Sequence, residues 1–201
     1  MRAKSINVLL LGWTVCLAGA AAGCGDVVRQ DRSPVSLVIE SLAGASGASG
    51  KTGTFSGTLQ SDVVTMVNNS PSIFSDAGQV TMSFVMKDIL TTPSAMNSVT
   101  INRYRVTFRR SDGRNTPGVD VPFPFDSAVT FTIAPGGTVT QAFELIRHVA
   151  KMEAPLAALQ SSPVIISTVA DITFFGHDLA GNELSASGTL GIQFGNFADP
   201  N

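Results

Sequence analysis

The chain has 201 residues, a formal net charge of −2, two histidines and two cysteines. A chain without a cationic excess has no general electrostatic attraction to nucleic acid, and two histidines leave few groups for general acid–base catalysis. The length suits one domain with a sizeable core.

The N-terminus has the order of segments found in secretory signal peptides. Arg2 and Lys4 come first, an apolar stretch covers residues 8–17, and small residues fill positions 18–23. The apolar stretch is too short to cross a bilayer as a helix. The sequence therefore predicts export and removal of residues 1–23.

Ala21-Ala22-Gly23-Cys24, at the end of this segment, resembles the lipobox of bacterial lipoproteins. The resemblance covers the first two dozen residues and departs from the usual pattern at Ala21, where leucine is common. It implies cleavage before Cys24 and acylation of that residue, and two or three chains at about 0.8 kcal/mol per buried CH₂ anchor a protein firmly. Gly25 stands where aspartate would retain a lipoprotein at the inner membrane, so the outer membrane is expected. An ordinary secreted protein cut near Ala22 is the alternative.

Cleavage would restrict the chemistry of the remaining 178 residues, which are the 201 less the first 23. Cys16 and Trp13 would leave with the signal peptide, and lipid would occupy the thiol of Cys24. The mature domain could then contain no disulfide, no thiol nucleophile and no cysteine-ligated metal site. The mature domain would have no tryptophan and only one tyrosine, Tyr104. Because sugar-binding surfaces usually use the flat rings of these residues, sugar binding is disfavoured. Eleven Lys and Arg against fifteen Asp and Glu would give a charge of −4.

The rest of the chain predicts β-strands. We expect a lipidated tether over residues 24–34, a β-domain over 35–197 and a tail over 198–201. Predicted strands cover residues 35–39, 54–67 (one strand or two joined by a bulge), 79–86, 99–108, 129–133, 138–146, 164–175 and 183–194. Residues 134–137 are predicted to join two of these as a hairpin, residues 43–53 to form a flexible loop, and residues 147–160 a short helical insertion.

Two further segments resemble known modules. Asp178-Leu179-Ala180-Gly181-Asn182 resembles the turn of the last hairpin in bacterial immunoglobulin-like and fibronectin-type modules. Tyr104-Arg105-Val106, before a Ser-Asp-Gly turn, resembles a middle strand of them. The resemblance covers about a third of the mature chain, and roughly seven to nine short strands independently favour the same fold. We predict an all-β, immunoglobulin-like antiparallel β-sandwich with one short helical insertion.

The strand over residues 99–108 carries the strongest charge pattern. Its inward face is predicted to hold Val99, Ile101, Tyr104, Val106 and Phe108, with a bulge between Ile101 and Tyr104. The outer face and the following turn hold Arg103, Arg105, Arg109, Arg110 and Arg114. One interpretation is a solvated face that protects an edge strand from aggregation. The other is a docking face for an anionic partner, either anionic lipid or an acidic envelope protein, because arginine binds phosphate and carboxylate through two donors.

No pattern predicts catalysis. His148 and His177 are isolated in sequence, and no G-x-S-x-G nucleophile motif is present. Gly50-Lys51-Thr52 lacks the first glycine of a phosphate-binding loop. Two loops supply hard oxygen atoms of the kind that calcium prefers, one with Asp112, Asn115 and Asp120 and the other with Asp178, Asn182 and Glu183. Neither has the dense spacing of a calcium loop, so we expect no metal and no cofactor.

These observations predict a non-enzymatic, lipid-anchored envelope protein whose β-domain binds or braces another envelope component. Its partners are expected to be the membrane, through the lipid, and an envelope protein or anionic lipid, but no nucleic acid. The alternative is a periplasmic carrier that holds a small apolar ligand between its sheets, against residues such as Phe84, Phe108 and Phe143. A large enclosed cavity would favour the carrier, and a filled core would favour the binding protein.

Overall fold

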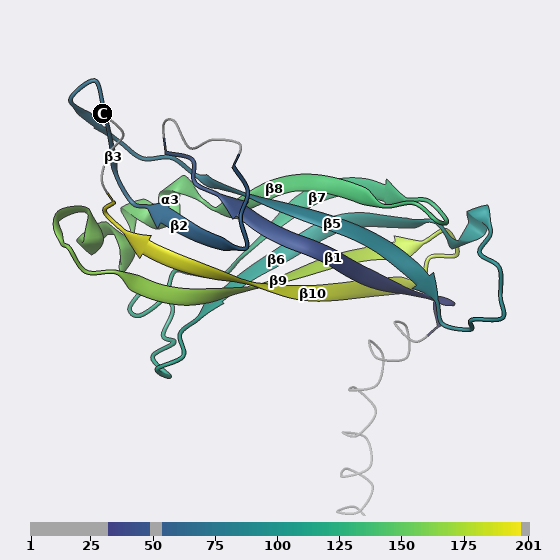
Figure 1. Ribbon diagram of the computed structural model, residues 1–201. Coiled ribbons are helices and arrows are strands. Elements are labelled where there is room, and N and C mark those ends of the chain that lie inside the picture. Colours follow the sequence, from purple (N-terminus) through teal and green to yellow (C-terminus); the bar gives the residue numbers. More distant parts are fainter. Residues whose placement is uncertain (1–31, 49–53, 198–201) are drawn as a thin grey trace, which may run out of the picture.

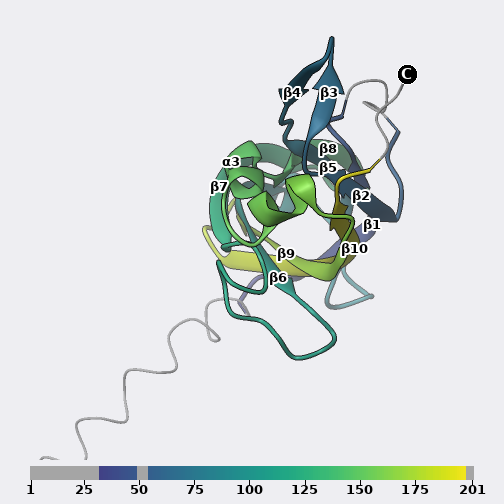
Figure 2. The same ribbon diagram turned by 90° about the vertical axis from the view of Figure 1, so that its left-hand side faces the viewer.

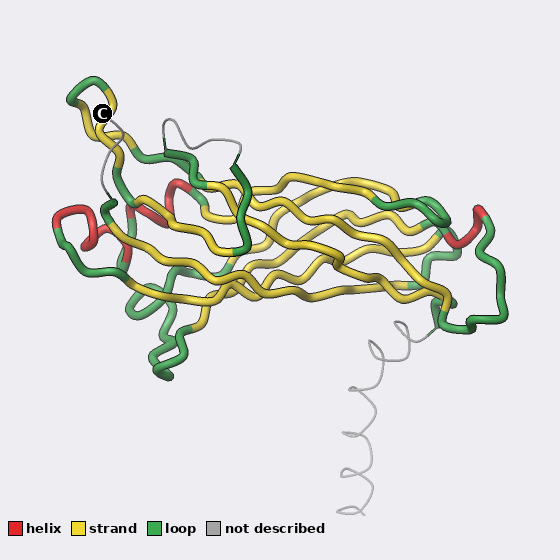
Figure 3. The backbone as a smooth tube through the Cα atoms, viewed as in Figure 1, coloured by secondary structure: helices red, strands yellow, loops and turns green. Residues whose placement is uncertain are grey.

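Two packed β-sheets account for most of the chain in the computed structural model, which describes residues 32–48 and 54–197 (Figure 1; Figure 3). One sheet has the strand order β1-β5-β8, with bounds Val35–Ala45, Asp76–Met86 and Val139–Ile146. The other has the order β2-β10-β9-β6-β7, with bounds Thr58–Asp62, Glu183–Gly195, Ile166–Asp178, Val99–Arg109 and Phe125–Ile133. The predicted signal peptide, Cys24 and most of the predicted tether lie outside the described residues.

The remaining elements are short. A separate hairpin consists of β3 (Thr65–Val67) and β4 (Ser70–Ser72), joined by Asn68 and Asn69 with positive φ. The helical segments are η1 (Ala95–Asn97), α3 (His148–Met152) and η2 (Leu156–Ser161). Pro155 precedes η2, so the predicted insertion over residues 147–160 is confirmed as two short helical pieces.

The long strands run between two ends of the molecule (Figure 1). We call the end where the described chain begins, at Arg32, the entry end; it also holds the loops over residues 87–98, 134–138 and 179–182. The opposite or far end holds the loops over residues 63–75, 110–124 and 147–165. Figure 2 looks along the strands from the far end and shows α3 and η2 covering it.

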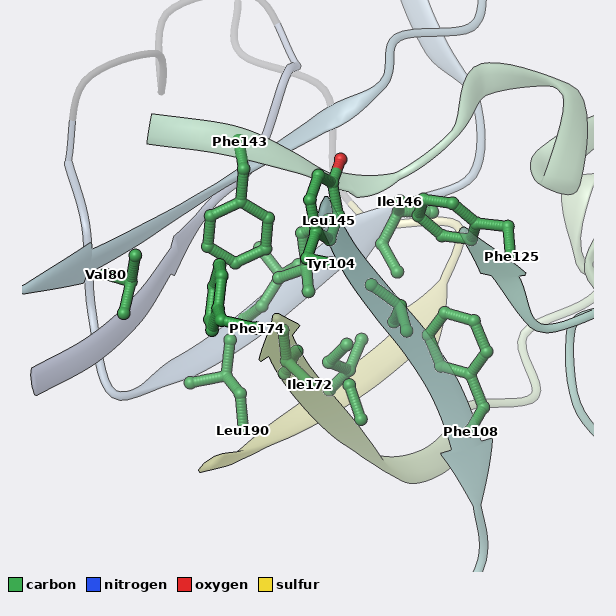
Figure 4. Packing of buried hydrophobic residues seen from close by; sticks show 14 of the residues in the cluster. Val80, Tyr104, Phe108, Phe125, Phe143, Leu145, Ile146, Ile172, Phe174 and Leu190 are labelled. Carbon is green, nitrogen blue, oxygen red and sulfur yellow. The ribbon is translucent and has the colours of Figure 1, made fainter. Parts of the chain in front are cut away.

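The core lies between the two sheets and is rich in aromatic rings (Figure 4). Tyr104 on β6 is 1% exposed, and its ring centroid lies 5.0 Å from that of Phe143 on β8. The Phe143 ring in turn lies 5.3 Å from Phe174 on β9. The Tyr104 hydroxyl donates a 2.8 Å hydrogen bond to the carbonyl of Glu144, so this phenol joins the two sheets while its polar atom is satisfied.

Strand periodicity predicts several elements correctly. Val80, Met82 and Phe84 are buried on one face of β5. The pairing of β6 with both neighbours shifts between Ile101 and Arg103, which confirms the predicted bulge. β9 and β10 form the predicted last hairpin. These features need only an alternating pattern and a turn, both of which are local.

The predicted hairpin across residues 134–137 is wrong. β7 pairs with β6 in the five-stranded sheet, whereas β8 pairs with β5 in the three-stranded sheet. The turn therefore carries the chain from one sheet to the other. A turn sequence indicates that the chain reverses, but it does not indicate which strand each arm will join.

Two other predicted boundaries also differ. β1 continues to Ala45, so residues 43–45 are strand rather than loop, and Gly44 pairs with Gly78. A Cβ on Gly44 would lie 3.0 Å from the Leu190 side chain, so the absence of a side chain allows the sheets to approach closely. The predicted strand over residues 54–67 divides into β2 and β3, which belong to different sheets.

Candidate functional site

Arg103, Arg105 and Arg109 lie on the outer face of the five-stranded sheet, and we call this surface the arginine face. β6 alternates there between buried apolar residues and exposed arginines. It lies between β7 and β9, so the interpretation of these arginines as protecting an edge strand is wrong. The bulge after Ile101 shifts the inward–outward alternation by one residue, and as a result all three arginines point outward.

Aspartates on the two neighbouring strands bind these arginines. Asp126 on β7 accepts hydrogen bonds from Arg103 at 2.9 Å and from Arg105 at 2.7 Å. Asp171 on β9 accepts one from Arg109 at 2.8 Å. The hydrogen bond from Arg105 is the main cause that lowers the pKa of Asp126, and the same pairing raises the pKa of Arg105. Three guanidinium groups thus share two carboxylates.

Arg110 and Arg114 form a separate group in the turn after β6. Both bind the carboxylate of Asp112, at 2.6 Å and 2.9 Å. Their hydrogen bonds, first from Arg110 and then from Arg114, lower the pKa of Asp112 to about 2. Asn115 accepts a hydrogen bond from the backbone of Arg110. The five arginines predicted as one surface therefore divide into three on the sheet and two that stabilise a turn.

An aromatic ring and a shallow hollow extend the arginine face toward the entry end. The guanidinium carbon of Arg103 lies 3.9 Å from the ring centroid of Phe175, its cross-strand neighbour on β9. Beside this pair is a hollow of about 350 Å³ lined in part by Asn102, His177 and Glu183. Hydroxyl pairs join the strands on the same face, Thr100 with Thr132 and Thr173 with Ser187. The surface thus offers cationic, hydroxyl and aromatic groups.

A buried ion pair at the far end has no signal in the sequence. Lys151 on α3 and Asp76 at the start of β5 are both fully buried, with Lys151 Nζ 2.9 Å from the carboxylate. Lys151 also donates to the carbonyl of Asp62 at 2.8 Å. Asp76 accepts further hydrogen bonds from the hydroxyl of Ser61 at 2.6 Å and the backbone N–H of Gly47 at 2.9 Å. Four segments of chain therefore meet at one pair of charges.

The buried pair is arranged as a structural cross-link. Burial raises the pKa of Asp76 even though the charge of Lys151 acts to lower it. The ammonium donates two hydrogen bonds and lies 2.9 Å from the second carboxylate oxygen, and both oxygens have protein partners, as buried charges require. The pair holds α3 against β5 and β2 across 75 positions of sequence. A local pattern could not have indicated this contact.

The other candidate residues do not form a site. His148 lies at the far end and His177 at the entry end. In residues 32–48 and 54–197, no three His, Cys, Asp or Glu side chains are grouped so as to hold a metal ion. The Asp178 carboxylate accepts hydrogen bonds from Ser33, Ala180 and Asn182, and Asp120 accepts one from a backbone N–H. These loop carboxylates hold turns, as such residues often do.

Comparison of the chain with known protein families, with curated proteins and with solved structures found no match. Within the described part of the chain, no helix has the length and apolar character needed to span a membrane.

Proposed function

We propose that this chain is a non-enzymatic lipoprotein of the bacterial cell envelope, anchored to the outer membrane through Cys24. Its β-domain, an immunoglobulin-like sandwich in this proposal, binds an acidic protein of the envelope through the arginine face. The signal-like N-terminus and the lipobox resemblance support the anchor.

The strand order supports the immunoglobulin-like part of the proposal. In that fold the first, second, fourth and fifth strands lie in one sheet, and the third, sixth and seventh lie in the other. β6-β9-β10 corresponds to the second group, and β1-β5-β8 to the first, second and fifth strands, when β7 is taken as an additional edge strand and β2 as a continuation of the first strand. Among the described residues the three-stranded sheet has no counterpart of the fourth strand. The buried Tyr104 occupies the third strand of this scheme, where antibody domains place a tryptophan.

The sharing of two carboxylates among three arginines is the observation that carries the binding proposal. Within this ladder the guanidinium groups outnumber the carboxylates by one, in a domain that is acidic as a whole. Glu183 lies farther along the face, in the lining of the hollow beside Arg103. Exposed ion pairs are weak, about 0–1 kcal/mol each, so Arg103, Arg105 and Arg109 can exchange their carboxylates for those of a partner at small cost. Because the face presents Asp126 and Asp171 as well, it suits the mixed charges of a protein better than a uniformly anionic lipid surface.

The core argues against the carrier. Phe84, Phe108 and Phe143, which a carrier would use to line its cavity, belong to one continuous buried cluster. Phe108 packs against Phe194 at 6.2 Å between ring centroids, and Phe143 packs against Tyr104. These rings pack against one another between the sheets, and Phe143 also lines one side of a hollow of about 290 Å³ with Phe55 and Ala77.

The binding proposal can be tested by photo-cross-linking in intact cells. A photo-reactive amino acid at Thr107, between Arg105 and Arg109 on β6, should form a discrete adduct with an envelope protein. The same group at Thr140, on the exposed side of β8, is the positional control. Replacing Arg103, Arg105 and Arg109 with glutamine should abolish the adduct. Replacing them with lysine should only weaken it, because lysine keeps the positive charge but lacks the planar group that donates two hydrogen bonds to one carboxylate.

An adduct that is unchanged in the glutamine variant would refute the arginine face as a binding site. Loss of the adduct together with loss of binding to anionic vesicles would assign the face to lipid instead. The anchor has a separate test. Intact mass should show acylation at Cys24, and Cys24→Ser should move the protein out of the membrane fraction. Wild-type protein without an acyl mass would refute the lipoprotein assignment.

A further inference from the structure

Two adjacent apolar side chains at the entry end are almost fully exposed. Ile89 is 91% exposed and Leu90 is 90% exposed, the largest values among the exposed large apolar residues. Met96 in η1 and Leu179 in the β9–β10 turn add exposed apolar surface at the same end. An ordered loop that presents two neighbouring apolar residues to solvent suggests a surface that is covered in the working protein.

Hydrogen bonds hold the Ile89–Leu90 loop tip in an outward position. The side chain of Asp88 accepts hydrogen bonds from the backbone N–H of Leu90 at 2.9 Å and from the hydroxyl of Thr91 at 3.1 Å. The carbonyl of Asp88 accepts another from the N–H of Thr91. The turn thus satisfies the backbone N–H groups of Leu90 and Thr91, which lowers the cost of moving the apolar side chains out of water.

The start of the described chain is bound to the turn that exposes Leu179. The hydroxyl of Ser33 donates a buried 2.9 Å hydrogen bond to the carboxylate of Asp178. Asp178 also accepts from the backbone of Ala180 and Asn182, which orders the turn around Leu179. The chain therefore enters the domain beside one exposed apolar residue and at the same end as the others (Figure 1).

The spacing between the proposed lipid and the domain keeps the entry end near the membrane. Cys24 and Arg32 are eight residues apart, so even a fully extended chain of this length spans at most about 29 Å. We propose, on the basis of the lipid anchor proposed above, that the entry end contacts the bilayer and that Ile89, Leu90, Met96 and Leu179 insert into its interfacial region. The domain then stands on its end, with the arginine face directed sideways toward a neighbouring protein.

The far end provides an internal comparison. It also exposes apolar residues, among them Val119 at 66% and Val164 at 57%, which are as exposed as Met96 at 63% and Leu179 at 57%, whereas Ile89 and Leu90 at the entry end are clearly more exposed. The eleven residues of β6 separate the two ends by about 36 Å. An anchor attached at the entry end keeps the far end away from the bilayer in this orientation.

The test uses tryptophan fluorescence of the full, lipidated protein in vesicles of phosphatidylethanolamine and phosphatidylglycerol. Trp13 is the only tryptophan of the chain and lies in the predicted signal peptide, so an introduced tryptophan reports its own position. Leu90→Trp and Leu179→Trp should show blue-shifted emission and a loss of intensity when the vesicles contain lipids brominated on their acyl chains. Val164→Trp, the matched far-end control, should show neither change.

Intact mass measured on the same samples separates this inference from the anchor. If the protein is acylated but Leu90→Trp and Leu179→Trp are quenched no more than Val164→Trp, the end-on orientation is wrong and the lipoprotein assignment stands. If all three are quenched equally, the domain lies flat and the orientation is again wrong. If no acyl mass is found, both proposals fail.

Discussion

Lys151→Met should strongly destabilise the protein because it removes one partner of a fully buried ion pair. The variant leaves the Asp76 carboxylate buried with only Ser61 and Gly47 as donors, and it removes the donor to the carbonyl of Asp62. Breaking a buried pair in this way costs about 3–5 kcal/mol. In a domain of this size each kcal/mol lowers Tm by about 2–4 °C, so the expected loss is roughly 6–20 °C.

The complementary change is Asp76→Asn, which keeps the shape but leaves the ammonium of Lys151 without a countercharge. An unpaired charge in a buried position is strongly unfavourable, so this variant should also lose about 3–5 kcal/mol of stability.

Urea denaturation followed by far-ultraviolet circular dichroism measures both effects. The double variant should lose less stability than the sum of the single variants, with a coupling of about 1–3 kcal/mol for residues in contact. Arg32→Met, at an exposed position, is the control and should change stability by no more than about 0.5 kcal/mol. A loss below about 1 kcal/mol for Lys151→Met, or additivity in the double variant, would refute the cross-link.

Two further predictions concern the entry end and the core. Burial alone would raise the pKa of Asp178, but hydrogen bonds from Asn182 and Ser33 outweigh this effect and hold that pKa below its usual range. The ionised Asp178 therefore stabilises the folded protein above about pH 4, and this contribution is lost as the pH falls through the lowered pKa. Asp178→Asn should cost about 1–3 kcal/mol and make acid unfolding less steep, and a variant with an unchanged acid transition would contradict this. Gly78 lies directly against the Phe143 ring, so a Cβ there would overlap it; Gly78→Ala should cost about 1–3 kcal/mol in thermal unfolding, and combining it with Phe143→Leu should recover part of that loss if the overlap is the cause.

The sequence by itself determines where most of the long strands lie and the direction of their side chains, although not where β1 and β7 begin or end. Alternation places Val80, Met82 and Phe84 inward on β5, and the break in the alternation after Ile101 locates the bulge. It also separates the buried Tyr104 from the exposed arginines on β6. These properties follow from the two-residue period of a strand, which is readable over a few neighbouring positions.

Only the tertiary structure decides which segments meet. It assigns β7 and β8 to different sheets, although one short turn connects them. It brings Asp126 and Asp171 to the arginines from strands on opposite sides of β6, and it joins Lys151 to Asp76. Contacts over such distances depend on the packing of the whole chain, and no local pattern encodes them. The sequence alone therefore could not predict the ion pairs of the arginine face with Asp126 and Asp171, or the buried ion pair at the far end.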